Sequence, residues 1–260
     1  MRIRIAVLCS DGPHHKFLVR SLASDFNIVS VVEEPAAAQI QRLRQKRKWR
    51  DWLWWNYHEV RRRLLRLDAY RQRYFANAPK VPSNRFPTPI KVAWINDSET
   101  IHTLNRTKPD ITVVMGTSIL KKPVLRIAGL VINIHGGYLP DFRGNHCFFW
   151  ALYENRQDRI GSTIHFIDEG IDTGDIIEHI VPRIFPSDNA EMLYCRAEKL
   201  AVQRLVELLK SYEAGHPLPR HPQDSGGSMY RTRDRKPYHD IILWARRNWL
   251  YWSVGGGGRR

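Results

Sequence analysis

Short apolar runs alternate with helical patterns at the start of the chain and indicate a layered α/β fold. Residues 3–8 are an apolar, β-branched run typical of a buried strand, and the turn residues SDGP follow it directly. Residues 14–23 repeat apolar positions at helical spacing, and residues 27–32 form a second apolar run. This β-α-β opening predicts a parallel sheet, because a crossover helix returns the chain for another strand in the same direction.

The alternation continues after a Pro-rich loop at residues 78–89. Further strands are predicted at 90–95, 110–115, 130–135, 161–166 and 175–181. Helices are predicted at 98–106 with Ser98 as its cap, at 146–154, and from a cap at Asp188 or Asn189 to residue 213. The predicted fold is an open, mostly parallel twisted sheet with helices on both faces, similar to a Rossmann fold. In such a fold, ligands bind beyond the carboxyl ends of the strands.

The pattern divides the chain into a catalytic domain at residues 1–213 and an irregular, basic extension at 214–260. Within the domain, residues 36–76 form a basic, aromatic helical insertion. Residues 41–75 hold twelve Lys or Arg against three Asp or Glu, with an apolar stripe at helical spacing. The stripe consists of Leu53, Tyr57, Val60, Leu64 and Leu67. A membrane surface, a nucleic-acid groove, and packing on the domain or a second subunit all fit this segment.

The net charge of +15 indicates an anionic partner or surface. Cys9, Cys147 and Cys195 lie far apart without metal-ligand spacing, so neither a disulfide framework nor a metal site is expected. The N-terminus lacks the apolar core of a signal peptide. The expected location is the cytoplasm, with a peripheral position at the inner face of the membrane as a further option. No GxGxxG follows the first strand, so a dinucleotide is not expected.

Two polar side chains interrupt the apolar strand at 130–135. Asn133 and His135 are two residues apart, so they share one face of the strand at its carboxyl end. An amide N–H and an imidazole suit an oxygen that gains negative charge during acyl transfer. Gly136 and Gly137 follow and leave room for a planar substrate. On spacing alone, a polar pair that only satisfies loop carbonyls is the favoured interpretation.

A second polar element, HFIDEGIDTG, occupies residues 165–174 between two predicted strands. One of its carboxylates could orient His135 and accept a proton through water. An ordinary acidic turn, in which Asp and Gly favour the local backbone geometry, is the alternative.

The motifs Asn133-x-His135, LPxFRG at 139–144 and ID-x-TG at 171–174 together resemble the folate-dependent formyltransferase family. Its members formylate glycinamide ribonucleotide, methionyl-tRNA or amino sugars. The resemblance implies a catalytic trio of Asn133, His135 and Asp172. It further implies direct transfer of a formyl group from N10-formyltetrahydrofolate to a primary amine, without a covalent enzyme intermediate and without a metal.

The resemblance also implies a slot for the pterin between two loops. One loop is Met115, Gly116, Thr117, Ser118, Ile119 and Leu120, and the other is Phe166, Ile167, Asp168, Glu169, Gly170 and Ile171. Residues that could contact the acceptor are Ser10, Asp11, Gly12, His15, Lys16, Gly136, Gly137, Tyr138 and Arg143. His146 and His165 flank the site without an assigned role, and Glu198 is expected on an exposed helix face.

The family often has Pro-Ser after the catalytic His, where this chain has Gly136-Gly137, so the departure concerns the acceptor side rather than the reaction. An anionic amino sugar on a nucleotide or lipid carrier is the favoured acceptor. About fifty residues follow the last long helix, too few for the β-barrel of the tRNA enzymes, so nucleic acid is disfavoured. The alternatives are a formyltetrahydrofolate hydrolase and a formyltransferase-like protein that binds methionyl-tRNA, RNA or membrane. An oligomer is compatible with the sequence.

Overall fold

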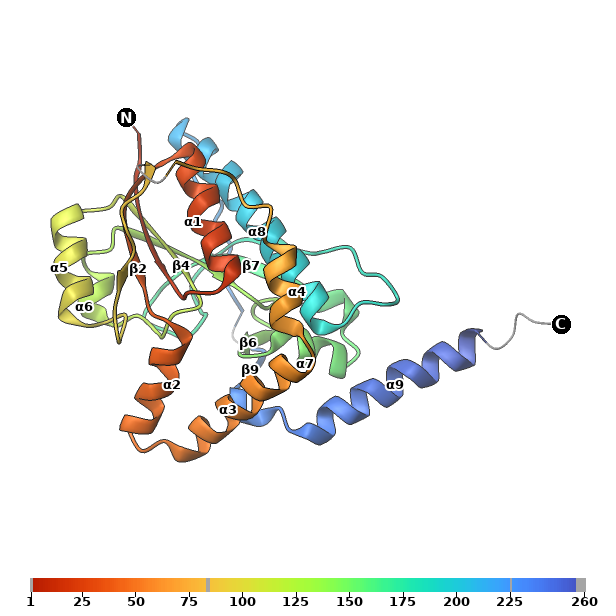
Figure 1. The fold of residues 1–260 in the computed structure, drawn as a ribbon. Coiled ribbons are helices and arrows are strands. Elements are labelled where there is room, and N and C mark those ends of the chain that lie inside the picture. Colours follow the sequence, from red (N-terminus) through yellow and green to blue (C-terminus); the bar gives the residue numbers. More distant parts are fainter. Residues whose placement is uncertain (1, 83–84, 225, 256–260) are drawn as a thin grey trace.

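The computed structural model describes residues 2–82, 85–224 and 226–255, and a seven-stranded sheet forms its centre. The strand order is β3-β2-β1-β4-β5-β7-β8. The first five run parallel, whereas β7 is antiparallel to both β5 and β8. The predicted open, mostly parallel sheet is therefore confirmed (Figure 1). The strands are β1 Arg4–Cys9, β2 Asn27–Glu33, β3 Ile90–Lys91, β4 Ile111–Met115, β5 Leu130–His135, β7 Ser162–Phe166 and β8 Ile176–Ile180.

Helices cover both faces of this sheet (Figure 1). On one face, α1 (Pro13–Asp25) and α8 (Ala190–Glu213) pack on the strands around Ile132. On the other, α5 (Ser98–Thr107) and α6 (Lys122–Leu125) pack around Leu8. A third cluster joins α7 (Cys147–Tyr153) to α8. Because both faces are covered, the central strands read as continuous apolar runs, and a polar residue within one of them is conspicuous.

Two local predictions near residue 95 are wrong. The strand predicted at 90–95 ends at Lys91, because the chain turns between Trp94 and Asp97, whose backbone N–H donates to the Trp94 carbonyl at 3.1 Å. The cap of α5 is Asp97 rather than Ser98. Its carboxylate accepts from the backbone N–H of Thr100 at 3.1 Å, as N-cap side chains do.

The basic insertion is helical as predicted, but it consists of three helices. These are α2 (Ala36–Gln45), α3 (Trp49–Leu64) and α4 (Leu67–Tyr74). The chain changes direction at Arg47 and Arg66, which have φ values of 54° and 55°. A left-handed residue ends a helix because it breaks the repeating backbone geometry. The insertion leaves the sheet after β2, passes below it with α3, and returns along α1 and α8 with α4 (Figure 1).

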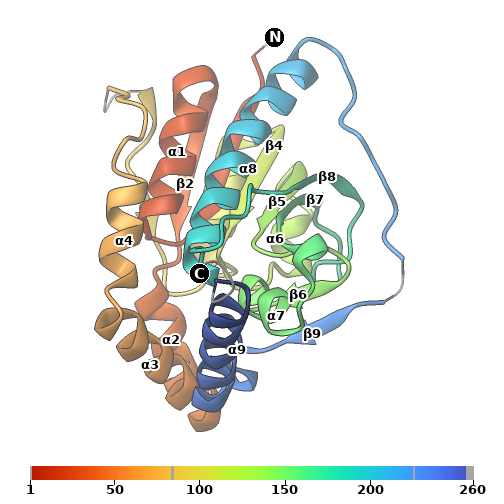
Figure 2. The ribbon, with the colours of Figure 1, turned by 90° about the vertical axis from the view of Figure 1, so that its right-hand side faces the viewer.

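The extension after α8 was predicted to be irregular, and this prediction is wrong. The chain returns around the outside of the domain and forms β9 (Ser228–Tyr230), which pairs in parallel with β6 (Phe142–Gly144) (Figure 2). A short 3-10 helix at Thr232–Asp234 and the long helix α9 (Pro237–Gly255) follow. Within residues 2–82, 85–224 and 226–255, no helix combines the length and apolar character needed to span a bilayer.

Helix α8 carries a buried carboxyl group against the sheet. Glu198 is 1% exposed, so its expected place on an exposed helix face is wrong. Its Oε1 accepts a hydrogen bond from the Ser162 hydroxyl of β7 at 2.7 Å. Burial raises the pKa of Glu198 to about 7, because the low-dielectric interior disfavours the charged form. The folded protein therefore keeps a proton that the unfolded chain has already released.

We expect Glu198→Gln to change the pH dependence of stability. Between the ordinary pKa of 4.5 and about 7, wild-type stability falls as pH rises, because only the unfolded carboxyl is ionised in that window. The variant lacks this loss. The free energy of unfolding of the variant minus that of the wild type should therefore rise by roughly 1–3 kcal/mol across the window. Urea unfolding at several pH values measures this difference. The histidines titrate in the same window, but they contribute equally to both proteins and cancel in the difference. Glu207→Gln, on the exposed side of α8, is the control. A pH-independent difference would contradict the assignment.

Candidate active site

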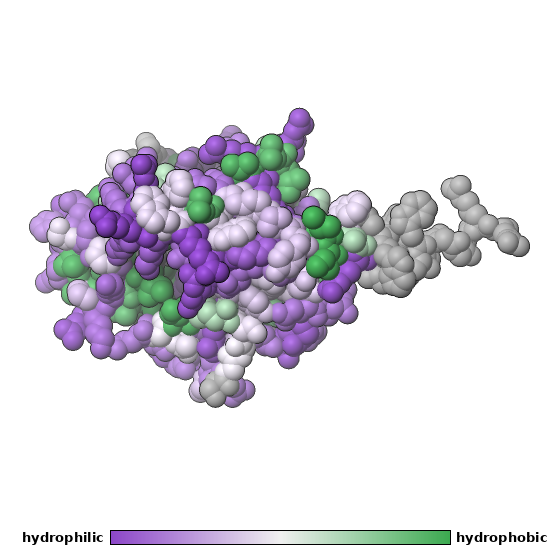
Figure 3. Space-filling model, turned by 90° about the horizontal axis from the view of Figure 1, so that it is seen from below, coloured by the Kyte–Doolittle hydropathy of each residue, from purple (hydrophilic) through white to green (hydrophobic). Residues whose placement is uncertain are grey.

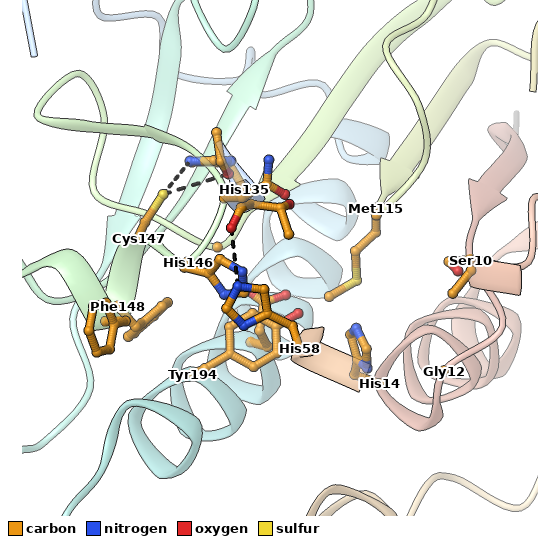
Figure 4. A pocket seen from close by; sticks show the side chains of 18 of the residues that line it. Ser10, Gly12, His14, His58, Met115, His135, His146, Cys147, Phe148 and Tyr194 are labelled. Carbon is orange, nitrogen blue, oxygen red and sulfur yellow. Dashed lines mark hydrogen bonds between the residues drawn. The ribbon is translucent and has the colours of Figure 1, made fainter. Parts of the chain in front are cut away.

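A cleft of about 1300 Å³ lies beyond the carboxyl ends of β1, β4 and β5. Its walls come from the loops after these strands, from the loop between β7 and β8, and from α7 and α8. The basic insertion and the C-terminal extension line it as well, through α3, α4, the 3-10 helix and α9. Figure 4 shows His135 on one side of this cleft and the start of α1, with Ser10 and His14, on the other. The cleft lies where ligands bind in open α/β sheets.

Asn133 is held by the strand opposite it. The pairing of β5 with β7 places Asn133 directly across from His165. The Asn133 amide donates to Nε2 of His165 at 3.0 Å, and Nδ1 of His165 donates to the Phe166 carbonyl at 2.7 Å. A carbonyl can only accept, so the second bond fixes the tautomer and leaves Nε2 as the acceptor. Burial and the nearby His135 lower the pKa of His165 to about 4, which keeps this ring neutral.

His135 lies deeper, between two oxygen atoms. Its Nε2 donates to the Phe142 carbonyl at 3.2 Å, and its Nδ1 lies 3.6 Å from Oδ2 of Asp172. The Cys147 thiol is 3.7 Å from Nε2, and burial raises the pKa of that thiol, so it remains uncharged beside the imidazole. These contacts fix the orientation of the ring.

Asp172 lies beside both histidines. Its Oδ1 lies 3.8 Å from Nε2 of His165, and its Oδ2 accepts from the backbone N–H of Gly144 at 3.3 Å. The residue has a φ of 54°, a conformation that non-glycine residues adopt at a cost of about 1 kcal/mol or more. The Gln223 amide compensates for this by donating to the Asp172 carbonyl at 3.2 Å. The chain thus holds a carboxylate in a strained position beside both rings.

The structure brings most of the predicted pterin-slot residues into the cleft. Phe166 and Glu169 are the exceptions, since neither lines it. The Phe166 side chain belongs to the core, and Glu169 forms an exposed ion pair with Lys122 at 2.7 Å. The slot residues that line the cleft are Met115, Gly116, Thr117, Ser118, Ile119, Leu120, Ile167, Asp168, Gly170 and Ile171.

The predicted acceptor contacts divide in the same way. Ser10, Asp11, Gly12, His15 and Gly136 line the cleft, whereas Lys16, Gly137, Tyr138 and Arg143 do not.

The two glycines after His135 serve different purposes. A Cβ at Gly137 would lie 2.6 Å from Nε2 of His135 and 2.7 Å from the Phe142 carbonyl, so its absence allows this ring to pack. A Cβ at Gly136 would lie 2.9 Å from the Tyr194 ring, which occupies the space on the cleft side. The glycine pair therefore shapes both the seat of His135 and the wall of the cleft.

Several cleft residues were not predicted. Besides His165 and Tyr194, the insertion contributes His58, whose ring lies 4.5 Å from that of His146. Burial lowers the pKa of His58 to about 4 and that of His146 well below its usual range, so this pair is neutral. The cleft is also lined by six arginines, namely Arg61, Arg62, Arg63, Arg71, Arg231 and Arg235. Their clustering in sequence was visible, but their orientation toward the cleft depends on where the insertion folds.

Four of these arginines are neutralised within the protein. Arg61 and Arg235 both contact Asp240, Arg62 contacts Glu59 and Asp68, and Arg71 contacts Glu191. Among the residues that the structure describes, no carboxylate lies within 4.0 Å of the guanidinium groups of Arg63 and Arg231, and both side chains are exposed. These two guanidinium groups are therefore available to an anion at the cleft.

Sequence and structure comparisons relate the chain to known proteins. A family model described as formyl transferase matches residues 67–209. A methionyl-tRNA formyltransferase from Methylacidiphilum infernorum is 35% identical over 154 residues, which cover 58% of this chain and 47% of that protein. The chain thus spans about half the length of the curated relatives that it matches.

Solved structures agree on the fold. A 4-N formyltransferase from Francisella tularensis superposes with a TM-score of 0.57 at 16% identity, covering 94% of this chain and 87% of that chain. A sugar N-formyltransferase from Shewanella sp. gives a TM-score of 0.56 at 15% identity with the same coverage. At such identities these structures show the fold alone. Because the family model covers more than half of the sequence, the chain belongs to the formyl transferase family.

Proposed function

We propose that this protein transfers a formyl group from N10-formyltetrahydrofolate to a primary amine. The observation that supports this most directly is the arrangement of Asn133, His135 and Asp172 at the end of β5, within a chain of the formyl transferase family. The cleft beside them is large enough for a folate and an acceptor together, since drug-sized ligands occupy about 300–1,000 Å³.

The residues suggest how the transfer proceeds. The acceptor amine attacks the formyl carbon, a C–N bond forms, and the carbonyl oxygen gains negative charge. Asn133 has one N–H committed to His165, so its second N–H is free to donate to this oxyanion. The His135 ring, held between the Phe142 carbonyl and Asp172, lies beside it. The bond from the formyl carbon to N10 then breaks, and a proton passes from the amine to N10 through water held by Asp172. Binding both substrates side by side supplies much of the rate.

We propose further that the amine is carried by an anionic group, with an amino sugar on a nucleotide or lipid carrier as the favoured acceptor. Arg63 and Arg231 support this, because they are exposed arginines of the cleft without a carboxylate partner in the described chain. Guanidinium groups bind phosphate through paired hydrogen bonds.

Methionyl-tRNA is the second candidate acceptor. The sequence relatives reported above carry that activity in their names, so the expectation against nucleic acid lacks their support. The insertion's positive charge would suit RNA as well as a nucleotide sugar. Hydrolysis of the formyl donor by water is a third outcome that the same assay detects.

Asn133→Ala should lower turnover roughly 100- to 1000-fold, because it removes an oxyanion donor while leaving the folate loops intact. The assay incubates the protein with N10-formyltetrahydrofolate, with and without nucleotide-linked amino sugars or methionyl-tRNA, and follows tetrahydrofolate release. Asn105→Ala, on the exposed surface of α5, is the matched control. Release without any acceptor indicates hydrolysis. Unchanged turnover in Asn133→Ala would contradict the assigned role, and no release with any acceptor would overturn the proposed function.

The double variant Arg63→Gln and Arg231→Gln should raise KM for an anionic acceptor about tenfold or more, with a smaller effect on KM for the formyl donor. Charge-assisted hydrogen bonds of this kind are worth about 1.5–3 kcal/mol. Initial rates at varied concentrations of each substrate separate the two constants. Arg126→Gln, exposed and remote from the cleft, serves as control. An unchanged acceptor KM would rule out these arginines as the anion site.

A further inference from the structure

Helix α3 presents two faces of different character. Its inner face contacts the C-terminal extension. There, Nε2 of the buried His58 is bonded to the Thr232 carbonyl at 3.1 Å, and Arg61 pairs with Asp240 at 2.8 Å. Its outer face carries large apolar side chains that are at least half exposed to solvent. These are Trp49, Leu53, Val60 and Leu64, which are 50%, 59%, 53% and 77% exposed.

The four outer residues form one continuous stripe. They lie at positions i, i+4, i+11 and i+15 of a helix, which places them within a narrow sector of its circumference and spreads them over roughly 22 Å. The stripe predicted from the sequence therefore needs correction. Tyr57 belongs to the inner face, where its ring contacts those of Trp54 and His58, and Leu67 begins the next helix.

Exposed cations surround this stripe. Arg47 and Lys48 precede the helix, Arg50 lies on its first turn, and Arg63 and Arg66 lie at its end. Across the described ranges, no carboxylate lies within 4.0 Å of any of these five side chains. Figure 3 views the molecule from below, the side on which α3 lies, and shows hydrophobic groups set among hydrophilic ones. A positive rim around an apolar stripe with tryptophan is typical of helices that lie in a bilayer surface.

Helix α9 extends this surface on the same side of the molecule (Figure 1). Its Tyr238, Ile241 and Trp244 are 55%, 64% and 68% exposed. Trp244 also lines the cleft, as do Arg63 and Leu65 next to the stripe. The apolar, basic face is therefore continuous with one rim of the cleft.

We propose that the outer face of α3, with the exposed side chains of α9 beside it, docks on an anionic phospholipid surface. Charge complementarity selects this occupant, because the stripe offers apolar side chains to the acyl region while its unpaired cations meet lipid phosphates. A second copy of the chain would bring the same cations against one another. An RNA would use the cations but would leave Leu53, Val60 and Leu64 without a role, since bases stack on aromatic rings.

Docking in this orientation gives the cleft access to the bilayer surface. An amine acceptor on a lipid carrier would then enter along the rim formed by Arg63, Leu65 and Trp244. This consequence rests on the proposed function, whereas the docking itself does not.

Co-sedimentation with vesicles tests the docking. The full chain should bind vesicles with about 30% phosphatidylglycerol at least tenfold more tightly than pure phosphatidylcholine vesicles, with an affinity that falls as salt rises. One triple variant, Leu53→Asn, Val60→Asn and Leu64→Asn, removes the apolar stripe and should weaken binding tenfold or more. A second triple variant, Arg47→Gln, Lys48→Gln and Arg50→Gln, removes cations beside the stripe and should weaken binding to the same extent. The matched controls are Val181→Asn, Ile184→Asn, Leu200→Asn for exposed apolar residues and Arg20→Gln, Arg106→Gln, Arg126→Gln for exposed cations.

Three outcomes would overturn the proposal. The first is that the protein does not bind anionic vesicles, and the second is that the control variants weaken binding as much as the test variants do. The third is that substituting the stripe leaves vesicle binding intact but abolishes dimers, measured by sedimentation velocity, or RNA binding, measured by a gel-shift assay with tRNA. Circular dichroism establishes that each variant is folded. Turnover of N10-formyltetrahydrofolate with a soluble acceptor is measured in parallel without vesicles, so a failure of docking is distinguishable from a failure of the proposed function.

Discussion

The antiparallel pairing of β7 with β5 is the constraint on which the site depends. It sets His165 opposite Asn133, so that a neutral imidazole accepts from the amide and fixes which way the amide faces. Because β7 runs against β5, its carboxyl end lies beside Ile132, whereas its start lies beside His135. The loop after β7 therefore starts near the amino end of β5 and folds back toward its carboxyl end, where Asp172 meets His135. The register between β5 and β7 and the folded-back loop together assemble the three polar groups.

Other parts of the chain hold this arrangement rather than contribute to it. Asp172 adopts a left-handed conformation that costs free energy, and its side chain and carbonyl are restrained by Gly144 and Gln223. Gln223 belongs to the extension after α8, and Gly144 belongs to β6, the strand that the extension pairs with. The extension therefore supports the site from behind, although it lies outside the region that the family model matches.

The sequence predicted the sheet and the face shared by Asn133 and His135, because both depend on short-range periodicity. The bounds of β5 match the prediction, and the spacing of two residues sufficed to put both side chains at one strand end. The role of His165 could not be predicted in this way, because it depends on the register between strands thirty residues apart. Glu198 is different. Its type suggested exposure, but Leu205, Ala201 and Tyr194 lie at helical spacing from it, and that periodicity indicated the buried face.

The basic insertion explains why strong charge alone was a poor guide to a partner. The same helix carries cations of two kinds, those that pair with carboxylates and those that remain free. Summed charge does not distinguish them, whereas helical geometry does, because residues one hundred degrees apart face different surroundings. Arg61 stabilises the contact of α3 with α9, whereas Arg63, two residues further along and therefore on another side of the same helix, meets solvent. A helix with two apolar or aromatic faces is costly to expose to water, so the outer face of α3 is itself a reason to expect a surface that covers it.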